Sequence, residues 1–190
     1  MFERFTGEAR QVVEGAVERC EQARADAVTE EDMLLAVLAM QGSRASSVLS
    51  ALGVDRRREA VEGALGQARR FGGISRADAE ALAELGIDVS EIVARVEGVH
   101  GRGALAAGRQ FQRWTPGGHR PFAPGAKAVL VRSLRAATAQ GARHIGDEHI
   151  LLALAIGPGV AADVLTEYGA SPGEIERVLR AGGDGTASAT

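Results

Sequence analysis

The chain has 190 residues, which suits one ordinary domain or two small packed repeats and excludes a large multi-domain machine. Its composition, 45% hydrophobic and 25% charged, excludes general disorder and a fibrous protein. The net charge of −3 conceals an uneven distribution, because residues 98–146 hold 8 basic and no acidic side chains, whereas residues 1–97 hold 12 basic and 18 acidic ones.

The beginning of the chain, MFERFTGEAR, carries charges where a signal peptide has its apolar run, and no apolar stretch approaches the length of a membrane span. We therefore expect a cytoplasmic protein without a membrane partner. The single cysteine, Cys20, cannot form an internal disulfide, and we expect it to be buried in a helix.

Helix signals predict four helices in the first part of the chain. Thr6 can cap a helix that runs to about Gln22, in which apolar residues recur with helical spacing. Thr29 precedes a short apolar helix over 30–40, a third helix ends near Gly53, and a fourth covers about 55–69.

The middle of the chain is expected to be only partly helical. Cap signals at Ser75 and Asp88 predict two short helices, which end at about Leu85 and Val99. Residues 101–120 hold glycines, a proline and no lasting apolar periodicity, so we expect an exposed linker there.

The last part repeats the order of the first. Pro124 suits the first turn of a long helix, because its missing N–H would have no partner within the helix. A short apolar helix over 147–156 follows Gly146, a third ends near Gly169, and a capping box starting at Ser171 opens a fourth over about 172–181.

The similarity of the two parts indicates an internal duplication. Residues 5–54 align with 122–170 at an offset of 117, which falls to 116 after a one-residue gap. No segment has the alternation of a strand, so we expect an all-α fold of two four-helix repeats joined by a partly helical insert. The expected boundaries are 1–69 for the first repeat, 70–119 for the insert and basic linker, 120–182 for the second repeat, and 183–190 for a disordered tail.

Common catalytic patterns do not occur in this sequence. The only lysine, Lys127, lies in a predicted helix and not in a phosphate-binding loop, and the four histidines include no zinc-binding helix motif. We therefore expect neither an enzyme nor a metal site or cofactor, and a hydrolase or metalloenzyme hidden in the insert is the weakest hypothesis.

Two acidic helix starts, 29–32 and 146–149, are the most distinctive polar features. Carboxylates are stabilised at a helix N-terminus, so both segments can be explained as helix caps alone. In the alternative interpretation, Glu31 and Glu148 each meet a guanidinium while nearby backbone N–H groups receive an attached anion.

The segments MFERFTGEAR, RPFAPGAKAVL and IGDEHILL resemble the Clp repeat, the duplicated N-terminal domain of the ClpC/ClpA class of AAA+ unfoldases. This resemblance covers both repeats and implies pseudo-twofold symmetry. Because AAA+ modules are lacking here, the chain is similar to the free-standing Clp N-domain-like proteins of actinobacteria. The resemblance implies a non-enzymatic protein- or peptide-binding module, an accessory, adaptor-like or decoy domain whose partners are clients, adaptors or Clp unfoldase components.

The family's glutamate in each repeat helps to bind phosphoarginine, which implies ligand-binding roles for Glu31 and Glu148, with Thr29, Gly146 and His149 beside them. The threonine before each glutamate in the family motif is replaced by Glu30 and Asp147, and the histidine after the first is replaced by Asp32. These carboxylates add repulsion toward a phosphate, so we expect the second repeat to hold the better site.

The aromatic at the family's start implies a peptide-binding face with Phe2 and Phe5, although Phe2 can also be a staple onto the first helix. The insert has three open interpretations: a connector packed on the repeats, a protein-docking segment, or a nucleic-acid-binding segment. The docking segment would use Arg109, Phe111, Arg113 and Trp114. A nucleic-acid-associated regulator that uses residues 98–146 is the alternative function, with nucleic acid the less expected partner.

Overall fold

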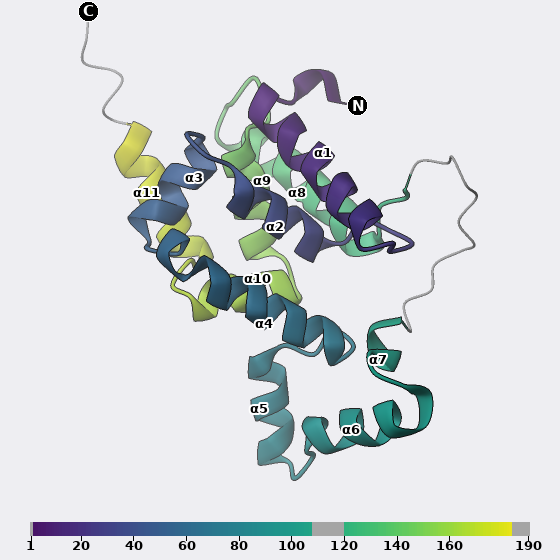
Figure 1. The fold of residues 1–190 in the computed structure, drawn as a ribbon. Helices are drawn as coiled ribbons and strands as arrows, with labels where there is room; N and C mark the ends of the chain where they lie inside the picture. The colour runs from purple at the N-terminus through teal and green to yellow at the C-terminus, as the bar shows by residue number, and fades with distance from the viewer. Residues whose placement is uncertain (1, 108–119, 184–190) are drawn as a thin grey trace, which may run out of the picture.

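The computed structural model describes residues 2–107 and 120–183, without the side chains of Phe2, Ala106 and Ala107. Within these residues all regular elements are helices, and two isolated β-bridges join segments between them (Figure 1). The all-α prediction is confirmed.

The first repeat contains four α-helices and two short 3-10 helices. The α-helices are α1 (Gly7–Gln22), α2 (Glu30–Ala39), α3 (Arg44–Ala51) and α4 (Arg58–Arg70), and the 3-10 helices are η1 (Phe2–Arg4) and η2 (Asp55–Arg57). Thr6 caps α1 as predicted, because its Oγ1 accepts a hydrogen bond from the Ala9 N–H at 3.2 Å. Gly53 follows α3 with a φ of 69°, a left-handed conformation that glycine adopts without strain.

The second repeat has the same order of helices. It consists of α8 (Pro124–Ala139), α9 (Asp147–Ile156), α10 (Val160–Glu167) and α11 (Pro172–Gly183). α1 and α8 both have 16 residues, α2 and α9 both have 10, and α3 and α10 both have 8. α11 reaches Gly183, the first residue of the expected tail, and the remainder of that tail lies outside the described residues.

The core is centred on α2 and α9. Nine of the ten residues of α9 and seven of the ten of α2 are buried, because each helix is covered by helices of both repeats. A short helix that is apolar on all sides is typical of such a central position. Within the described residues no single helix is long and apolar enough to cross a membrane; the bent pair α9 and α10 has that composition and belongs to the core.

Two reciprocal β-bridges connect the repeats. Phe5, before α1, pairs with Ile145, before α9, and Phe122, before α8, pairs with Val28, before α2. The hydrogen bonds run from Thr6 N–H to Ile145 O (3.0 Å), Ile145 N–H to Arg4 O (2.7 Å), Val28 N–H to Pro121 O (2.9 Å) and Ala123 N–H to Val28 O (2.8 Å). Since each partner is 117 residues from its equivalent, the two bridges are related by the pseudo-twofold symmetry of the repeats.

The insert forms a limb beside α4. α5 (Arg76–Glu84) and α6 (Val89–His100) lie below α4 in Figure 1, away from α1 and α8. α5 buries no residue and α6 buries only Val89 and Val93, so most of their surface faces solvent. Both helices begin at the predicted caps and end within a residue of the predicted ends.

Glu97 connects the insert to the first repeat. Its Oε1 accepts hydrogen bonds from Arg70 Nε and Gly103 N–H, both at 2.9 Å, and the Arg70 hydrogen bond lowers the pKa of Glu97 to about 2. The expected linker after Gly101 needs a correction, since α7 (Ala104–Ala107) begins there. Leu105 of this helix packs beside Gly72, where an added Cβ would lie 3.6 Å from the Leu105 Cβ.

Replacing Ala123 by proline tests the bridge between the repeats. The φ of Ala123 is −60°, which proline adopts without strain, so Ala123→Pro removes only the N–H that Val28 O accepts. We expect a loss of about 1–3 kcal/mol in the free energy of unfolding, measured with urea, because a buried carbonyl loses its donor.

Gly7→Pro is the control for this variant. Gly7 is the first residue of α1, occupies the position equivalent to Pro124, and has no acceptor for its N–H within the helix. Equal urea midpoints for the two variants would contradict the importance of the bridge.

Candidate functional site

The two acidic helix starts are buried at equivalent positions of α2 and α9. Glu31 and Asp32 are 4% and 2% exposed, and Glu148 and His149 are 5% and 2% exposed. Buried carboxylates are costly unless they are paired or lie at a helix N-terminus, so the partners of each group decide what it can bind.

In the first repeat, Asp32 is satisfied by the cap and by one arginine. Its Oδ2 accepts hydrogen bonds from the Thr29 N–H and the Thr29 hydroxyl, both at 3.0 Å, and its N–H donates to Thr29 Oγ1 at 3.3 Å. Arg69 on α4 donates to Asp32 Oδ1 at 2.9 Å. The contacts of Thr29 and Asp32 are therefore those of a capping box reinforced by an ion pair.

Glu31 is different, because its Oε2 is buried and has no hydrogen-bond partner among the described residues. A buried, unpaired carboxylate oxygen is rare in folded proteins and needs an explanation. The neighbouring Glu30 lies against two glycines: a Cβ added at Gly125 or Gly159 would meet its carboxylate oxygens at 1.9 and 2.4 Å.

The start of α2 opens into a pocket of about 680 Å³, within the usual size range of ligand sites. Its walls are the 23–27 turn, residues 29–32, the start of α8 at 123–126, and Arg69. Gly72, Gly73 and Leu105 complete the lining, so the insert contributes to the pocket. Among the described residues that line it, Asp26, Glu30, Glu31 and Asp32 supply four carboxylates against two arginines, Arg24 and Arg69.

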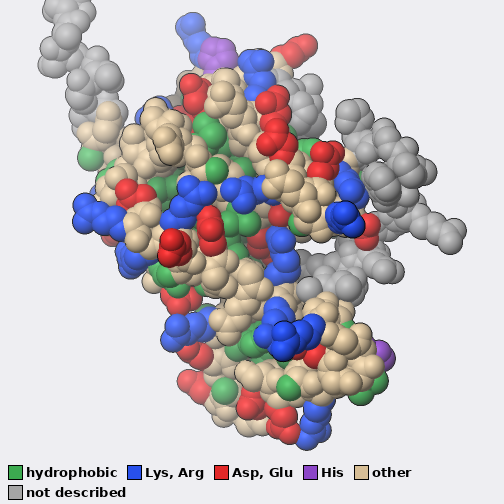
Figure 2. Space-filling view, viewed as in Figure 1, with side chains coloured by type: hydrophobic (Ala, Val, Ile, Leu, Met, Phe, Trp, Pro, Cys, Tyr) green, Lys and Arg blue, Asp and Glu red, His purple; other side chains and the backbone are tan. Residues whose placement is uncertain are grey.

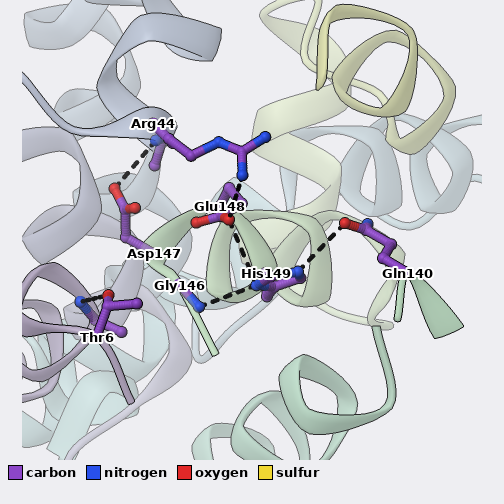
Figure 3. Close-up of polar contacts among 9 residues, drawn as sticks. Thr6, Arg44, Gln140, Gly146, Asp147, Glu148 and His149 are labelled. Carbon is purple, nitrogen blue, oxygen red and sulfur yellow. Dashed lines mark hydrogen bonds and ion pairs between the residues drawn. The ribbon is translucent and has the colours of Figure 1, made fainter. Parts of the chain in front are cut away.

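In the second repeat, the equivalent carboxylates already have partners (Figure 3). Arg44 extends from the first turn of α3 over Glu148 and donates to Oε1 at 3.1 Å, while the Ala45 N–H donates to Asp147 Oδ2 at 3.0 Å. Burial raises the pKa of Glu148, an effect that the charge of Arg44 opposes.

His149 takes the place of Asp32 in the second cap. Its Nδ1 accepts a hydrogen bond from the Gly146 N–H at 2.9 Å, so Nε2 carries the proton and faces Gln140 Oε1 at 3.2 Å. Burial, together with the nearby charge of Arg44, lowers the pKa of His149 and keeps the ring neutral near pH 7.

The structure does not bring the other predicted residues into these sites. Phe5 is 5% exposed and belongs to the core, which corrects its expected place on a peptide-binding face. The side chain of Phe2 lies outside the described residues, as do all the predicted docking residues: Arg109, Phe111, Arg113 and Trp114. Among residues 2–107 and 120–183 no three His, Cys, Asp or Glu side chains are grouped as metal ligands.

Sequence reasoning missed Arg44 and Arg69, the arginines that pair with the buried acids. They are 104 and 37 residues from their partners, so no local pattern links them. Acidic and basic side chains are interspersed over the face shown in Figure 2.

Comparison with known proteins identifies the family. A model of the Clp repeat (R) N-terminal domain matches residues 72–168, about half of the chain. The chain belongs to the Clp repeat N-terminal domain family.

Relatives extend this similarity over nearly the whole chain. Chaperone protein ClpC1, chloroplastic, of Oryza sativa subsp. japonica is 31% identical over 98% of this chain, and chaperone protein ClpC2, chloroplastic, of Arabidopsis thaliana is 38% identical over 56%. This Clp-repeat chain spans only 16% and 10% of their lengths. The crystal structure of the N-terminal domain of ClpD from Arabidopsis thaliana superposes with a TM-score of 0.52 and 16% identity, covering 95% of this chain and 97% of that one, and shows the same fold.

The cap made by His149 predicts a specific dependence of stability on pH. The pKa of His149 in the folded state lies below the ordinary value of 6.5. The stabilisation that the neutral His149 cap provides is therefore complete above pH 6.5 and is lost as the pH falls toward the folded pKa. Glu148 acts in the opposite sense, because its raised pKa favours proton uptake by the folded state.

His149→Asn keeps a neutral acceptor for the Gly146 N–H but does not titrate. We expect the free energy of unfolding of the wild type, measured with urea, to fall relative to that of His149→Asn as the pH is lowered from 7.5 to 5. The Glu148 contribution is common to both proteins and cancels in this comparison. A difference that is independent of pH would contradict the neutral cap.

Proposed function

We propose that this chain is a non-enzymatic module that binds protein segments for the Clp protease system. It acts by occupancy, as an accessory, adaptor-like or decoy recognition domain. Its partners are client or adaptor proteins, and the receiving surface is the pocket at the start of α2. Membership of the Clp repeat family supports this proposal, and the relatives named above are chaperones of the Clp class.

The observation that carries the proposal is the unpaired Oε2 of Glu31 beside a pocket of about 680 Å³. A pocket of this size holds a side chain with its flanking backbone. Small residues line much of it, including Ala25, Ala27, Gly73, Ala123 and Gly125, so the backbone of a bound segment has room to approach.

Glu31 and Glu148, with Thr29, Gly146 and His149 beside them, are the proposed positions for the guanidinium of an arginine-type ligand, phosphorylated or unmodified. The geometry favours the first repeat over the second, which reverses the ranking expected from charge along the sequence. Glu148 is already paired with Arg44, whereas Glu31 lines the open pocket.

Filling the pocket tests this function. Ala27 lies in a half-buried bend of the lining, and Ala27→Trp places an indole there. We expect labelled, reduced and carboxymethylated lactalbumin, which is permanently unfolded, to bind the wild type saturably in fluorescence anisotropy. Binding to Ala27→Trp should be at least about tenfold weaker, the size of effect that losing one anchor produces.

The matched control is Ala83→Trp, because Ala83 is exposed and lines a separate pocket between α4, α5 and α10. It should bind the unfolded protein like the wild type. Unchanged binding to Ala27→Trp would show that the pocket is not the receiving surface, and no binding to the wild type would contradict the proposed function itself.

A further inference from the structure

The second repeat shows which chemical group its buried glutamate accepts. Glu148 accepts a hydrogen bond from the guanidinium of Arg44 at 3.1 Å. Arg44 is the first residue of α3, so it reaches Glu148 from the other repeat. The chain thus contains its own example of an arginine side chain on this carboxylate.

The first repeat lacks the equivalent arginine. Under the offset of 116, Arg44 corresponds to Val160, the first residue of α10, which is buried and carries no charge. Glu31, the equivalent of Glu148, keeps a buried oxygen without a hydrogen-bond partner among the described residues. Within the described part of the chain, Glu31, which lines the pocket, therefore lacks the guanidinium partner that its symmetry equivalent Glu148 has.

The positions that an anion would prefer are taken by carboxylates of the chain. Asp147 accepts the Ala45 N–H at the start of α3, and Glu30 lies against Gly125 and Gly159 at the starts of α8 and α10. Helix N-termini attract anions, so these two side chains supply the negative charge there. A phosphate entering the pocket would meet Glu30, Glu31 and Asp32 at short range, and like charges oppose such an approach.

We propose that the pocket at the start of α2 binds the unmodified guanidinium of an arginine in a protein segment, with Glu31 as its acceptor, and that it discriminates against phosphorylated arginine. This inference rests on the proposed function and names its ligand. The Asp32–Arg69 ion pair forms one wall, and Glu31 is the lining carboxylate with a buried oxygen that has no hydrogen-bond partner among the described residues. Two N–H groups of one guanidinium match a carboxylate well, whereas the ammonium of lysine makes a single point contact.

The test uses four short glycine–serine peptides that differ only in one central residue: arginine, phosphoarginine, citrulline or lysine. Citrulline keeps the length and shape of arginine without the charge. In calorimetric titrations of the wild-type chain we expect the arginine peptide to bind at least about tenfold more tightly than the citrulline and phosphoarginine peptides, as a charged hydrogen bond implies. The affinity for the lysine peptide should lie between the affinities for the arginine and citrulline peptides.

Variants locate the site. Glu31→Gln should weaken binding of the arginine peptide at least about tenfold, toward the affinity of the wild type for the citrulline peptide. Glu18→Gln, which removes one exposed carboxylate from α1, should bind like the wild type. Far-ultraviolet circular dichroism checks that both variants keep their helices, and the four peptides on the wild type test the proposal even if Glu31→Gln fails to fold.

Three results would overturn the inference. These are tighter binding of phosphoarginine than arginine, equal binding of arginine and citrulline, and loss of arginine binding in Glu148→Gln but not in Glu31→Gln. If the unfolded lactalbumin still binds the wild type and is weakened by Ala27→Trp, the proposed function stands while the ligand class is wrong. If neither lactalbumin nor any peptide binds, both the proposed function and the proposed ligand class are wrong.

Discussion

The pairing of Val28 with Phe122 and of Phe5 with Ile145 is the constraint on which the rest of the molecule depends. Each bridge fixes the residue that lies two positions before α2 or α9. The two central helices therefore begin at defined places against the opposite repeat, with their free N–H groups and acidic first turns between the two halves. The other helices of the two repeats cover the apolar sides of α2 and α9 and close the core around them.

Within this symmetric frame, a few substitutions make the two helix starts unequal. The caps are chemically different but geometrically alike, since an aspartate oxygen in one repeat and a histidine nitrogen in the other accept the N–H of the cap residue. The first residue of the third helix is arginine in one repeat and valine in the other, and this difference decides whether the neighbouring buried glutamate is paired within the chain. The insert adds to the inequality, because Gly72, Gly73 and Leu105 line the pocket at the start of α2.

Local features were predictable from the sequence, and distant ones were not. Thr6, Thr29, Ser75 and Asp88 each accept a backbone N–H from within three residues, so their signals can be read from short segments. The buried acids could be located, but their partners could not, because Arg69 and Arg44 reach them from other helices. Counting charges near each glutamate favoured the second repeat, whereas the packing brings a guanidinium to that repeat and leaves the first one open. The short helix α7 was missed because Leu105 gains its packing partner only in the folded chain.

The reciprocal bridges also bear on how such a fold can arise. Each repeat offers the segment before its first helix and accepts its partner on the segment before its second, so both halves present the same surface to each other. This is an isologous contact, the arrangement found in twofold homodimers, and here the covalent connection replaces the second subunit. Two copies of a single repeat would satisfy the same backbone groups as the fused chain does. Fusion then frees each half to change its sequence independently, which a homodimer cannot do, and so allows one half to fill its acidic helix start while the other keeps its own open.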